Sequence, residues 1–122
     1  MKSYTDLEQS KKLVEILPLE SADMYYCYGM NIHMKGWSFN DTPTIIDNSS
    51  QIDVHTDISC WSLAALLDVL PRIDIEKEIW SSDKYDYRVK AYIGDGYVGD
   101  WYDNPIDACV EMIIKLHELK ML

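Results

Sequence analysis

The C-terminal segment NPIDACVEMIIKLHEL, residues 104–119, constrains the fold more than any other part of the chain. Asn104 is a typical N-cap, Pro105 occupies the first helical position, where no N–H is needed, and Asp107 lies near the positive end of the helix dipole. Apolar residues then recur at helical spacing, at Ile106, Cys109, Met112, Ile113, Leu116 and Leu119. The pattern predicts an amphipathic helix whose apolar stripe must be buried against another element.

A three-stranded antiparallel meander is predicted directly before this helix. Aromatic and β-branched residues bounded by turn residues indicate strands over residues 76–81, 85–93 and 97–102. A three-residue loop, Gly94-Asp95-Gly96, keeps the apolar side chains of the last two strands on one face and sets Lys90 against Asp100. A turn of Asp95 and Gly96 alone would mix the faces, so we predict the longer loop.

Two earlier segments read as helices that end at a proline. The first is predicted over residues 6–17, with Thr5 as the N-terminal residue of a capping box and Pro18 at its end. The second is predicted over residues 60–70, after Ser59 as N-cap and before Pro71. The matching ends LVEILP and LLDVLP raise the alternative of a duplicated helix-strand unit, at about residues 5–29 and 59–82.

Between these helices the local signals are weaker. The stretch ADMYYCYG predicts a strand that ends at Gly29, and TII at residues 44–46 is a short strand candidate within turn-forming sequence. Residues 30–56 are otherwise not assigned. The whole chain of 122 residues is predicted to form a single α+β domain, with a mainly antiparallel sheet packed against about three helices.

The charge of the chain limits its partners. It has 21 acidic and 11 basic side chains, a formal net charge of -10, and no Lys or Arg between Lys35 and Arg72. A surface of this sign gains nothing from phosphate backbones or anionic lipids, so we expect neither nucleic acid nor a membrane as a partner. The N-terminus lacks an apolar signal stretch, which predicts a cytoplasmic protein whose cysteines, Cys27, Cys60 and Cys109, are free thiols.

Two short stretches resemble a metal-binding motif. DVHTD at residues 53–57 and GDWYDN at residues 99–104 together place Asp53, His55, Asp100 and Asp103 as in the Asp-x-His and Gly-Asp-x-x-Asp pattern of the metallophosphoesterases. That family also needs a later Asn-His motif and further histidines, whereas only His117 follows here. We therefore interpret both stretches as polar surface and predict no metal site.

Other catalytic patterns are absent from the sequence. There is no zinc spacing of Cys or His, no phosphate-binding glycine loop and no calcium loop. Cys60 lies close to His55 in sequence, but it falls on an apolar stripe that is typical of a core cysteine. The sequence therefore predicts no catalytic residue and no cofactor, and a protein that is not an enzyme.

Aromatic residues are the remaining functional signal, with nine Tyr, four Trp and one Phe. Tyr and Trp are common where a surface must bind a protein and still remain in water, although they are also common in strands that have no binding role. If they mark a surface, the acidic residues near them belong to it. The candidate binding surface comprises Tyr25, Tyr28, Trp37, Asp53, Asp57, Tyr92 and Tyr102.

The stretches TDLEQSKKLVEILPLESADMYY, CWSLAALLDVLP and NPIDACVEMIIKLHEL resemble small uncharacterised proteins of gut Bacteroidales and of their phages and mobile elements. This resemblance implies an accessory role and carries no active site. The leading hypothesis is an anti-defence or other accessory module that binds a host or phage protein. The alternatives are a binder of a nucleotide-like small molecule and, third, a metal-dependent phosphoesterase. The sequence also leaves open a monomer or a homodimer joined through an edge strand.

Overall fold

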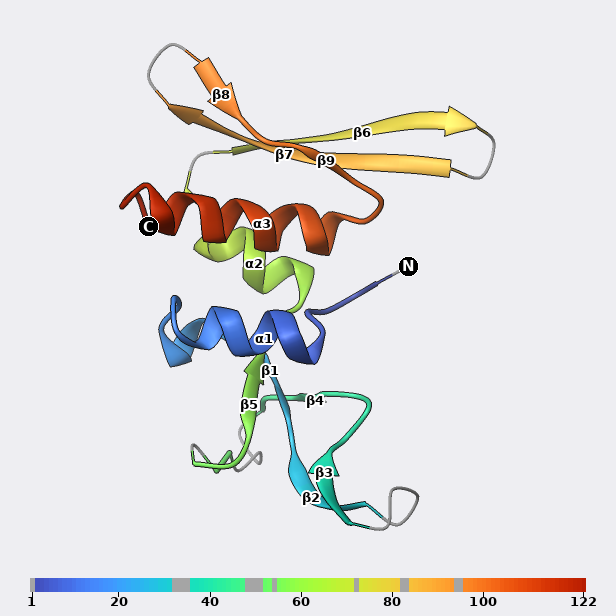
Figure 1. The fold of residues 1–122 in the computed structure, drawn as a ribbon, viewed down its shortest axis with the longest axis vertical. Coiled ribbons are helices and arrows are strands. Elements are labelled where there is room, and N and C mark those ends of the chain that lie inside the picture. The colour runs from blue at the N-terminus through green and yellow to red at the C-terminus, as the bar shows by residue number, and fades with distance from the viewer. Residues whose placement is uncertain are drawn as a thin grey trace.

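The helices lie in the middle of an elongated molecule, with one large sheet at one end and two small sheets at the other (Figure 1). This computed structural model describes residues 2–31, 36–47, 52–53, 55–71, 73–81, 84–93 and 96–122. The helices in this part of the chain are α1 (Leu7–Val14), the short 3-10 turn η1 (Leu19–Ser21), α2 (Leu63–Val69) and α3 (Pro105–Glu118). The strands are β1 (Met24–Tyr26), β2 (Tyr28–Asn31), β3 (Gly36–Phe39), β4 (Thr44–Ile45), β5 (Ile58–Cys60), β6 (Ile73–Ser81), β7 (Lys84–Ile93), β8 (Gly96–Val98) and β9 (Trp101–Tyr102).

Every strand pairing among the described residues is antiparallel. Strands β4, β1 and β5 form one small sheet, β2 and β3 form a hairpin, and β6, β7 and β8 form the large sheet, with β9 also paired to β7. The predicted α+β class, with a C-terminal antiparallel sheet and three helices, is therefore confirmed.

Helix α3 confirms the strongest of the sequence predictions. The Asn104 side chain accepts a hydrogen bond from the Asp107 backbone N–H at 2.8 Å, with Pro105 at the first helical position. The helix is covered by β7 on one side and by α2 on another, so its buried surface is wider than the predicted stripe. Leu119 lies beyond its last residue and is half exposed, which corrects its place in that stripe.

The large sheet differs from the predicted meander in three main ways: β6 begins at Ile73 and not at residue 76, the strand predicted over residues 97–102 is divided into β8 and β9, and the loop before β8 is shorter. Ile93 lies opposite Gly96, which leaves two residues between the strands in place of the predicted three. In this register Lys90 does not face Asp100, and its ammonium group contacts the Glu76 carboxylate instead. Tyr and Trp side chains are stable on either face of a half-exposed sheet, so the alternation of residue types did not fix the register.

The starts of α1 and α2 also differ from the prediction. Asp6, not Thr5, caps α1, since its carboxylate accepts the Gln9 N–H while the Gln9 side chain accepts the Asp6 N–H. The Thr5 hydroxyl is fully buried and lies 2.8 Å from the Ser10 hydroxyl. Both Thr and Asp favour the cap position, so core packing of the threonine decides between them.

Helix α2 begins three residues later than predicted, because Cys60, its predicted first residue, is the last residue of β5. The N-cap is Ser62, not Ser59, and its hydroxyl accepts the Ala65 N–H at 3.2 Å. Asp23, just before β1, accepts a hydrogen bond from the Ser62 N–H at 2.9 Å and also contacts its hydroxyl. Pro71 follows the helix as expected.

The strand predicted to stop at Gly29 is two strands. Cys27 separates β1 from β2, which pair with different strands. Gly29 lies inside β2, opposite Ser38 of β3. The predicted TII strand is confirmed as β4. The proposed helix-strand duplication stays a prediction. The strand after α1 is β1 and the strand after α2 is β6, and these two strands belong to different sheets.

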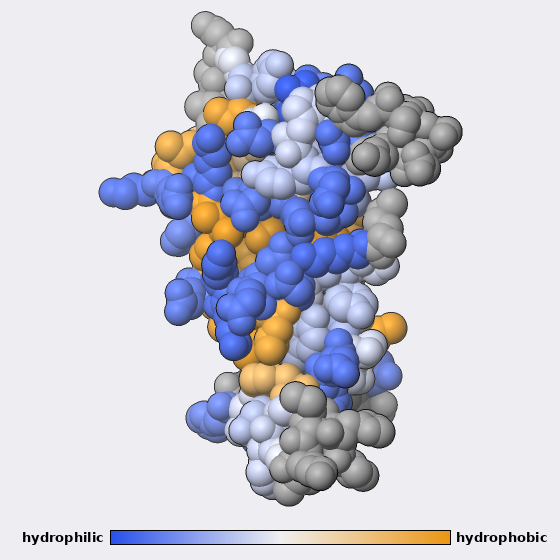
Figure 2. All heavy atoms as spheres, turned by 45° about the vertical axis from the view of Figure 1, so that its right-hand side comes forward, coloured by the Kyte–Doolittle hydropathy of each residue, from blue (hydrophilic) through white to orange (hydrophobic). Residues whose placement is uncertain are grey.

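One continuous apolar core joins the helices to the large sheet. Its fully buried side chains include Leu13 of α1, Leu66 of α2, Ile113 of α3 and Trp61 between β5 and α2. On the face in Figure 2, hydrophobic atoms reach the surface mainly along the middle of the molecule, among strongly hydrophilic side chains. Among the described residues, the core cluster includes none of strands β1 to β5, so the two small sheets lie to one side of it (Figure 1).

A polar network ties the N-terminus to the start of α3. The Lys2 ammonium lies 2.8 Å from the Asp107 carboxylate and 2.9 Å from that of Asp6. Gln9 and Asn104 donate further hydrogen bonds to Asp107, at 2.7 and 2.8 Å. Burial alone would raise the pKa of Asp107, but the hydrogen bonds from Lys2, Asn104 and Gln9 outweigh it and hold that pKa below its usual value.

We expect Asp107→Asn to lower the free energy of unfolding at pH 7 by about 1–2 kcal/mol, because it removes a charge-assisted network at a helix N-terminus. A depressed folded pKa adds stability above the unfolded pKa of about 3.9, and this is lost as the pH falls through the folded value. Urea unfolding from pH 7 to about pH 2.5 should therefore show the two proteins converging below about pH 4. Asp68→Asn, on the exposed side of α2, is the control. A difference that persists at the lowest pH would contradict the role of the carboxylate charge.

Candidate functional site

Three aromatic side chains form an exposed ridge on one face of the β2–β3 hairpin. Tyr28 lies directly opposite Phe39, so both side chains are on the same face, and Trp37 is two residues from Phe39 on that face. The Tyr28 ring centre is 5.0 Å from that of Phe39 and 6.1 Å from that of Trp37. Trp37 is 64% exposed and Tyr28 is 38% exposed. We call these three residues the aromatic ridge.

The carboxylates of Asp53 and Asp57 accept hydrogen bonds from backbone groups beside the ridge. The Asp57 carboxylate accepts hydrogen bonds from the Tyr28 N–H at 3.0 Å and from the Asp53 N–H at 2.9 Å. The Asp53 carboxylate in turn accepts the His55 N–H at 3.0 Å. These contacts form a tight turn in which the acidic side chains satisfy backbone donors. The turn therefore holds the first residue of β2 in place.

A hollow of about 390 Å³ adjoins the ridge. Phe39 belongs to both, since it contacts Tyr28 in the ridge and also lines the hollow. Burial raises the pKa of Tyr26, whose hydroxyl donates to the Thr5 carbonyl at 2.8 Å. The hollow is lined by the apolar and aromatic residues Tyr4, Leu7, Tyr26 and Phe39 and by the polar residues Lys2, Asp6, Asn40 and Asp41.

The structure divides the predicted binding surface. Tyr28, Trp37, Asp53 and Asp57 lie together at the hairpin end, as the ridge and the turn beside it. Tyr25 is 8% exposed, so its assignment to a surface is wrong, because its strand β1 is paired on both edges and covered. The two remaining residues, Tyr92 and Tyr102, belong to the large sheet or its last strand at the other end of the molecule.

Phe39 was missed by the sequence reasoning. It lies in the region 30–56 that carried no assignment, and its partner strand was expected to stop at Gly29. The signal that was available is the alternation Trp37-Ser38-Phe39, which is typical of a strand with one aromatic face.

Tyr92 lies on the outer face of the large sheet, within a network that already satisfies its members. Its hydroxyl contacts the Asp74 carboxylate, and this hydrogen bond raises the pKa of Tyr92. Nearby, the Arg88 guanidinium lies 4.5 Å from the Trp101 ring centre and 2.6 Å from the Glu76 carboxylate. The side chains of Tyr92, Arg88 and Trp101 on this face are therefore already in contact with other side chains of the sheet.

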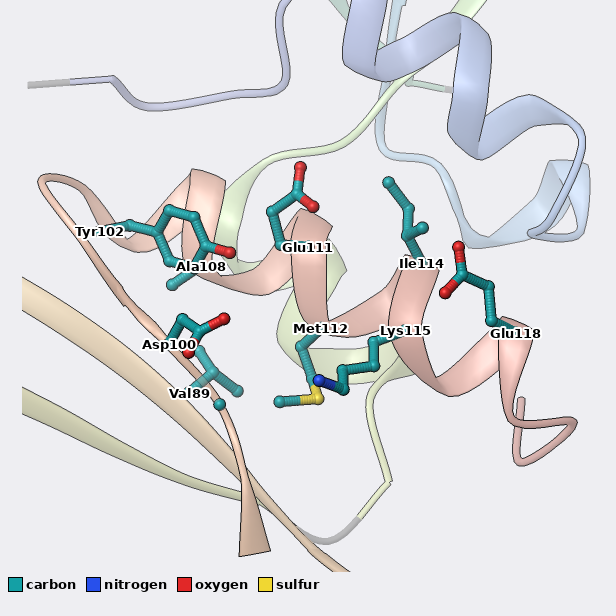
Figure 3. A pocket seen from close by; sticks show the side chains of 10 residues that line it. Val89, Asp100, Tyr102, Ala108, Glu111, Met112, Ile114, Lys115 and Glu118 are labelled. Carbon is teal, nitrogen blue, oxygen red and sulfur yellow. The ribbon is translucent and has the colours of Figure 1, made fainter.

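Tyr102 lines a second cavity, of about 230 Å³, between α3 and the large sheet (Figure 3). Burial raises the pKa of Tyr102, and the carboxylates of Glu111 and Asp100 raise it further. The same cavity is lined by Glu118 and by one cation, Lys115. The three carboxylates of this lining, those of Asp100, Glu111 and Glu118, repel phosphate, so the cavity does not favour a nucleotide-like ligand.

The other sequence motifs do not gather into a reactive site. In the part of the chain that is described, no three His, Cys, Asp or Glu side chains lie close enough to hold a metal ion. The segments that carry the two halves of the phosphoesterase pattern lie at opposite ends of the molecule, before β5 and around β9 (Figure 1). Burial raises the pKa of the Cys109 thiol to about 12 and also raises that of Cys60, so both thiols stay protonated.

Comparison of the chain with protein-family models, curated proteins and solved structures finds no match. None of the helices that the structure describes has both the length and the apolar character needed to cross a bilayer.

Proposed function

We propose that this chain is a non-enzymatic protein-binding module that contacts its partner through the aromatic ridge. The observation that carries the proposal is Trp37, which is 64% exposed and in ring contact with Tyr28 on one face of a hairpin. Trp and Tyr are enriched at protein interfaces, where single residues of this kind supply much of the binding energy.

The ridge is suited to binding because its rings are positioned before a partner arrives. The Tyr28 ring contacts both Trp37 and Phe39, and its backbone N–H is held by Asp57. A side chain that is already ordered loses less conformational entropy on binding than a free one. On the large sheet, by contrast, the rings of Tyr97 and Trp101 are in contact with the cations of Arg88 and Lys90.

The context of the sequence guides the choice of partner. Its resemblance to proteins of gut Bacteroidales, phages and mobile elements supports an accessory or anti-defence role, with a host or phage protein as the partner. The free cysteines, Cys27, Cys60 and Cys109, support a reducing cytoplasmic location. The protonated thiols and the acidic cavity favour neither nucleophilic catalysis nor a phosphate ligand.

The proposal is tested by affinity capture. The tagged full chain is used to retain proteins from lysate of the native host, and the retained protein is purified so that its affinity can be measured. We expect Trp37→Ala to weaken binding by about 30-fold or more, which corresponds to a hot-spot loss of about 2 kcal/mol. Mass spectrometry of small molecules in the same eluate tests the alternative of a bound metabolite.

Tyr97→Ala is the matched control, because Tyr97 is also a half-exposed ring but lies on the large sheet. Circular dichroism establishes that both variants are folded. Equal binding by wild type and Trp37→Ala would reject the ridge as the interface, as would an equal loss in Tyr97→Ala.

A further inference from the structure

The hollow beside the aromatic ridge indicates what kind of partner the protein takes. We infer that the hollow accepts an apolar or aromatic side chain from a basic polypeptide segment of the partner. The inference deepens the proposed function and rests on it, since the segment that fills the hollow would belong to the protein that covers the ridge.

The walls of the hollow suit an apolar side chain. They are formed by Leu7 at the start of α1, Tyr26 of β1, Phe39 at the end of β3 and Tyr4 of the N-terminal segment. The Tyr26 hydroxyl is already bonded to the Thr5 carbonyl, so this wall offers ring surface in place of a free donor. The volume of the hollow, about 390 Å³, falls within the range of about 300–1,000 Å³ that is usual for binding pockets.

The charged residues that line the hollow favour a positively charged group on the partner. Lys2, the one cation among them, is already shared between the carboxylates of Asp6 and Asp107. Asp41 also lines the hollow and is exposed, and none of the ion pairs formed among the described residues includes it. A Lys or Arg beside the anchoring side chain would place its charge next to this carboxylate.

The whole chain carries charge of the same sign, with 21 acidic against 11 basic side chains and a formal net charge of -10. An acidic surface of this kind speeds association with basic partners and disfavours acidic ones. Charge complementarity therefore points to a basic segment.

The hollow and the ridge form one continuous surface because Phe39 is part of both. An apolar anchor in a pocket, beside flat aromatic contacts and within a charged rim, is the usual arrangement of a binding hot spot. Leu7 lines only the hollow and Trp37 lies only in the ridge, so the two contributions are separable by substitution.

The inference is tested with a displayed library of random 16-residue peptides panned against the full chain. We expect enriched peptides to carry a large apolar or aromatic residue within a few positions of Lys or Arg, and to bind more weakly as salt rises. Their affinity should fall about 10-fold or more in Leu7→Gln, which keeps a helix-forming residue in α1, and in Asp41→Lys. Glu118→Lys makes the same charge change in the other cavity and should have little effect.

The outcomes separate the two proposals. Enriched peptides that bind Leu7→Gln and Asp41→Lys as tightly as wild type would overturn the hollow as their site, while a loss in Trp37→Ala would still support the ridge. A loss in Leu7→Gln and Asp41→Lys with no loss in Trp37→Ala would support the hollow and count against the ridge. No enrichment of peptides with this pattern would overturn the inference and leave the affinity capture to decide the proposed function.

Discussion

Trp61→Ala is expected to lower the free energy of unfolding by about 3–5 kcal/mol, the usual loss when a buried Trp is cut back to Ala. The Trp61 side chain is fully buried in the core cluster, and its indole N–H donates to the Ser21 hydroxyl at 3.0 Å. The Trp61 carbonyl also accepts a hydrogen bond from the Thr5 N–H, and the Trp61 N–H donates one to the Thr5 hydroxyl. A domain of this size is typically stable by only about 5–15 kcal/mol, so the loss is a large part of the total.

Urea unfolding followed by far-ultraviolet circular dichroism measures this loss without relying on the fluorescence of the removed indole. Trp37→Ala is the matched control, because it deletes the same side chain from an exposed position and should change stability by at most about 0.5 kcal/mol. Trp61→Phe keeps most of the ring and should fall between the two. Equal losses in the two alanine variants would contradict both the buried role of Trp61 and the exposed role of Trp37.

The contrast between the two tryptophans bears on function. Trp61 lies where β5 leads into α2, so it links the strands of the hairpin end to the helical core. Trp37 lies in the two-stranded hairpin outside that core, in ring contact with Tyr28. We therefore expect the protein to stay folded when Trp37 is replaced, so that Trp37→Ala tests binding and not folding.

Helix α3 could be predicted because every signal that defines it is local. The cap, Asn104, and the proline after it act within one turn, and the apolar spacing is carried by neighbouring residues. The starts of the other helices depend on distant residues. Asp23 bonds to Ser62 across 39 positions and favours it as cap over Ser59, while Thr5 is drawn into the core by contacts that include Trp61.

The candidate site could be predicted only in part for a similar reason. Tyr25 and Tyr28 belong to the same aromatic run, yet one is buried and the other exposed because the chain changes sheets at Cys27. Nothing in the run itself marks that change. Asp57 was assigned to the surface for its charge, whereas its position beside Tyr28 follows from a hydrogen bond across 29 residues. The residue types indicated an aromatic and acidic surface. Contacts between residues far apart in the sequence determined which of the predicted residues lie on it together.

In the large sheet, the backbone at Gly99 restricts which residue can occupy that position. The register of β8 against β7 continues in β9, with Ala91 opposite Val98 and Arg88 opposite Trp101. Pairing is interrupted between these strands, where Gly99 has a φ of 152°. A Cβ atom at this position would lie 2.2 Å from the Val89 carbonyl oxygen. The close approach of two backbones therefore requires glycine here.

Gly99→Ala is accordingly expected to destabilise the fold by about 2–4 kcal/mol, since it adds backbone strain to a clash in a packed region. The contact cannot be relieved by a rotamer change, because the atoms it meets are backbone atoms of Val89, whose side chain is buried in the core. Gly96→Ala is the control on the same sheet, as a Cβ there meets nothing within 4 Å. Thermal and urea unfolding of the two variants should differ by at least about 2 kcal/mol. Similar stability in both would mean that the chain between β8 and β9 can move away from β7 without loss of packing.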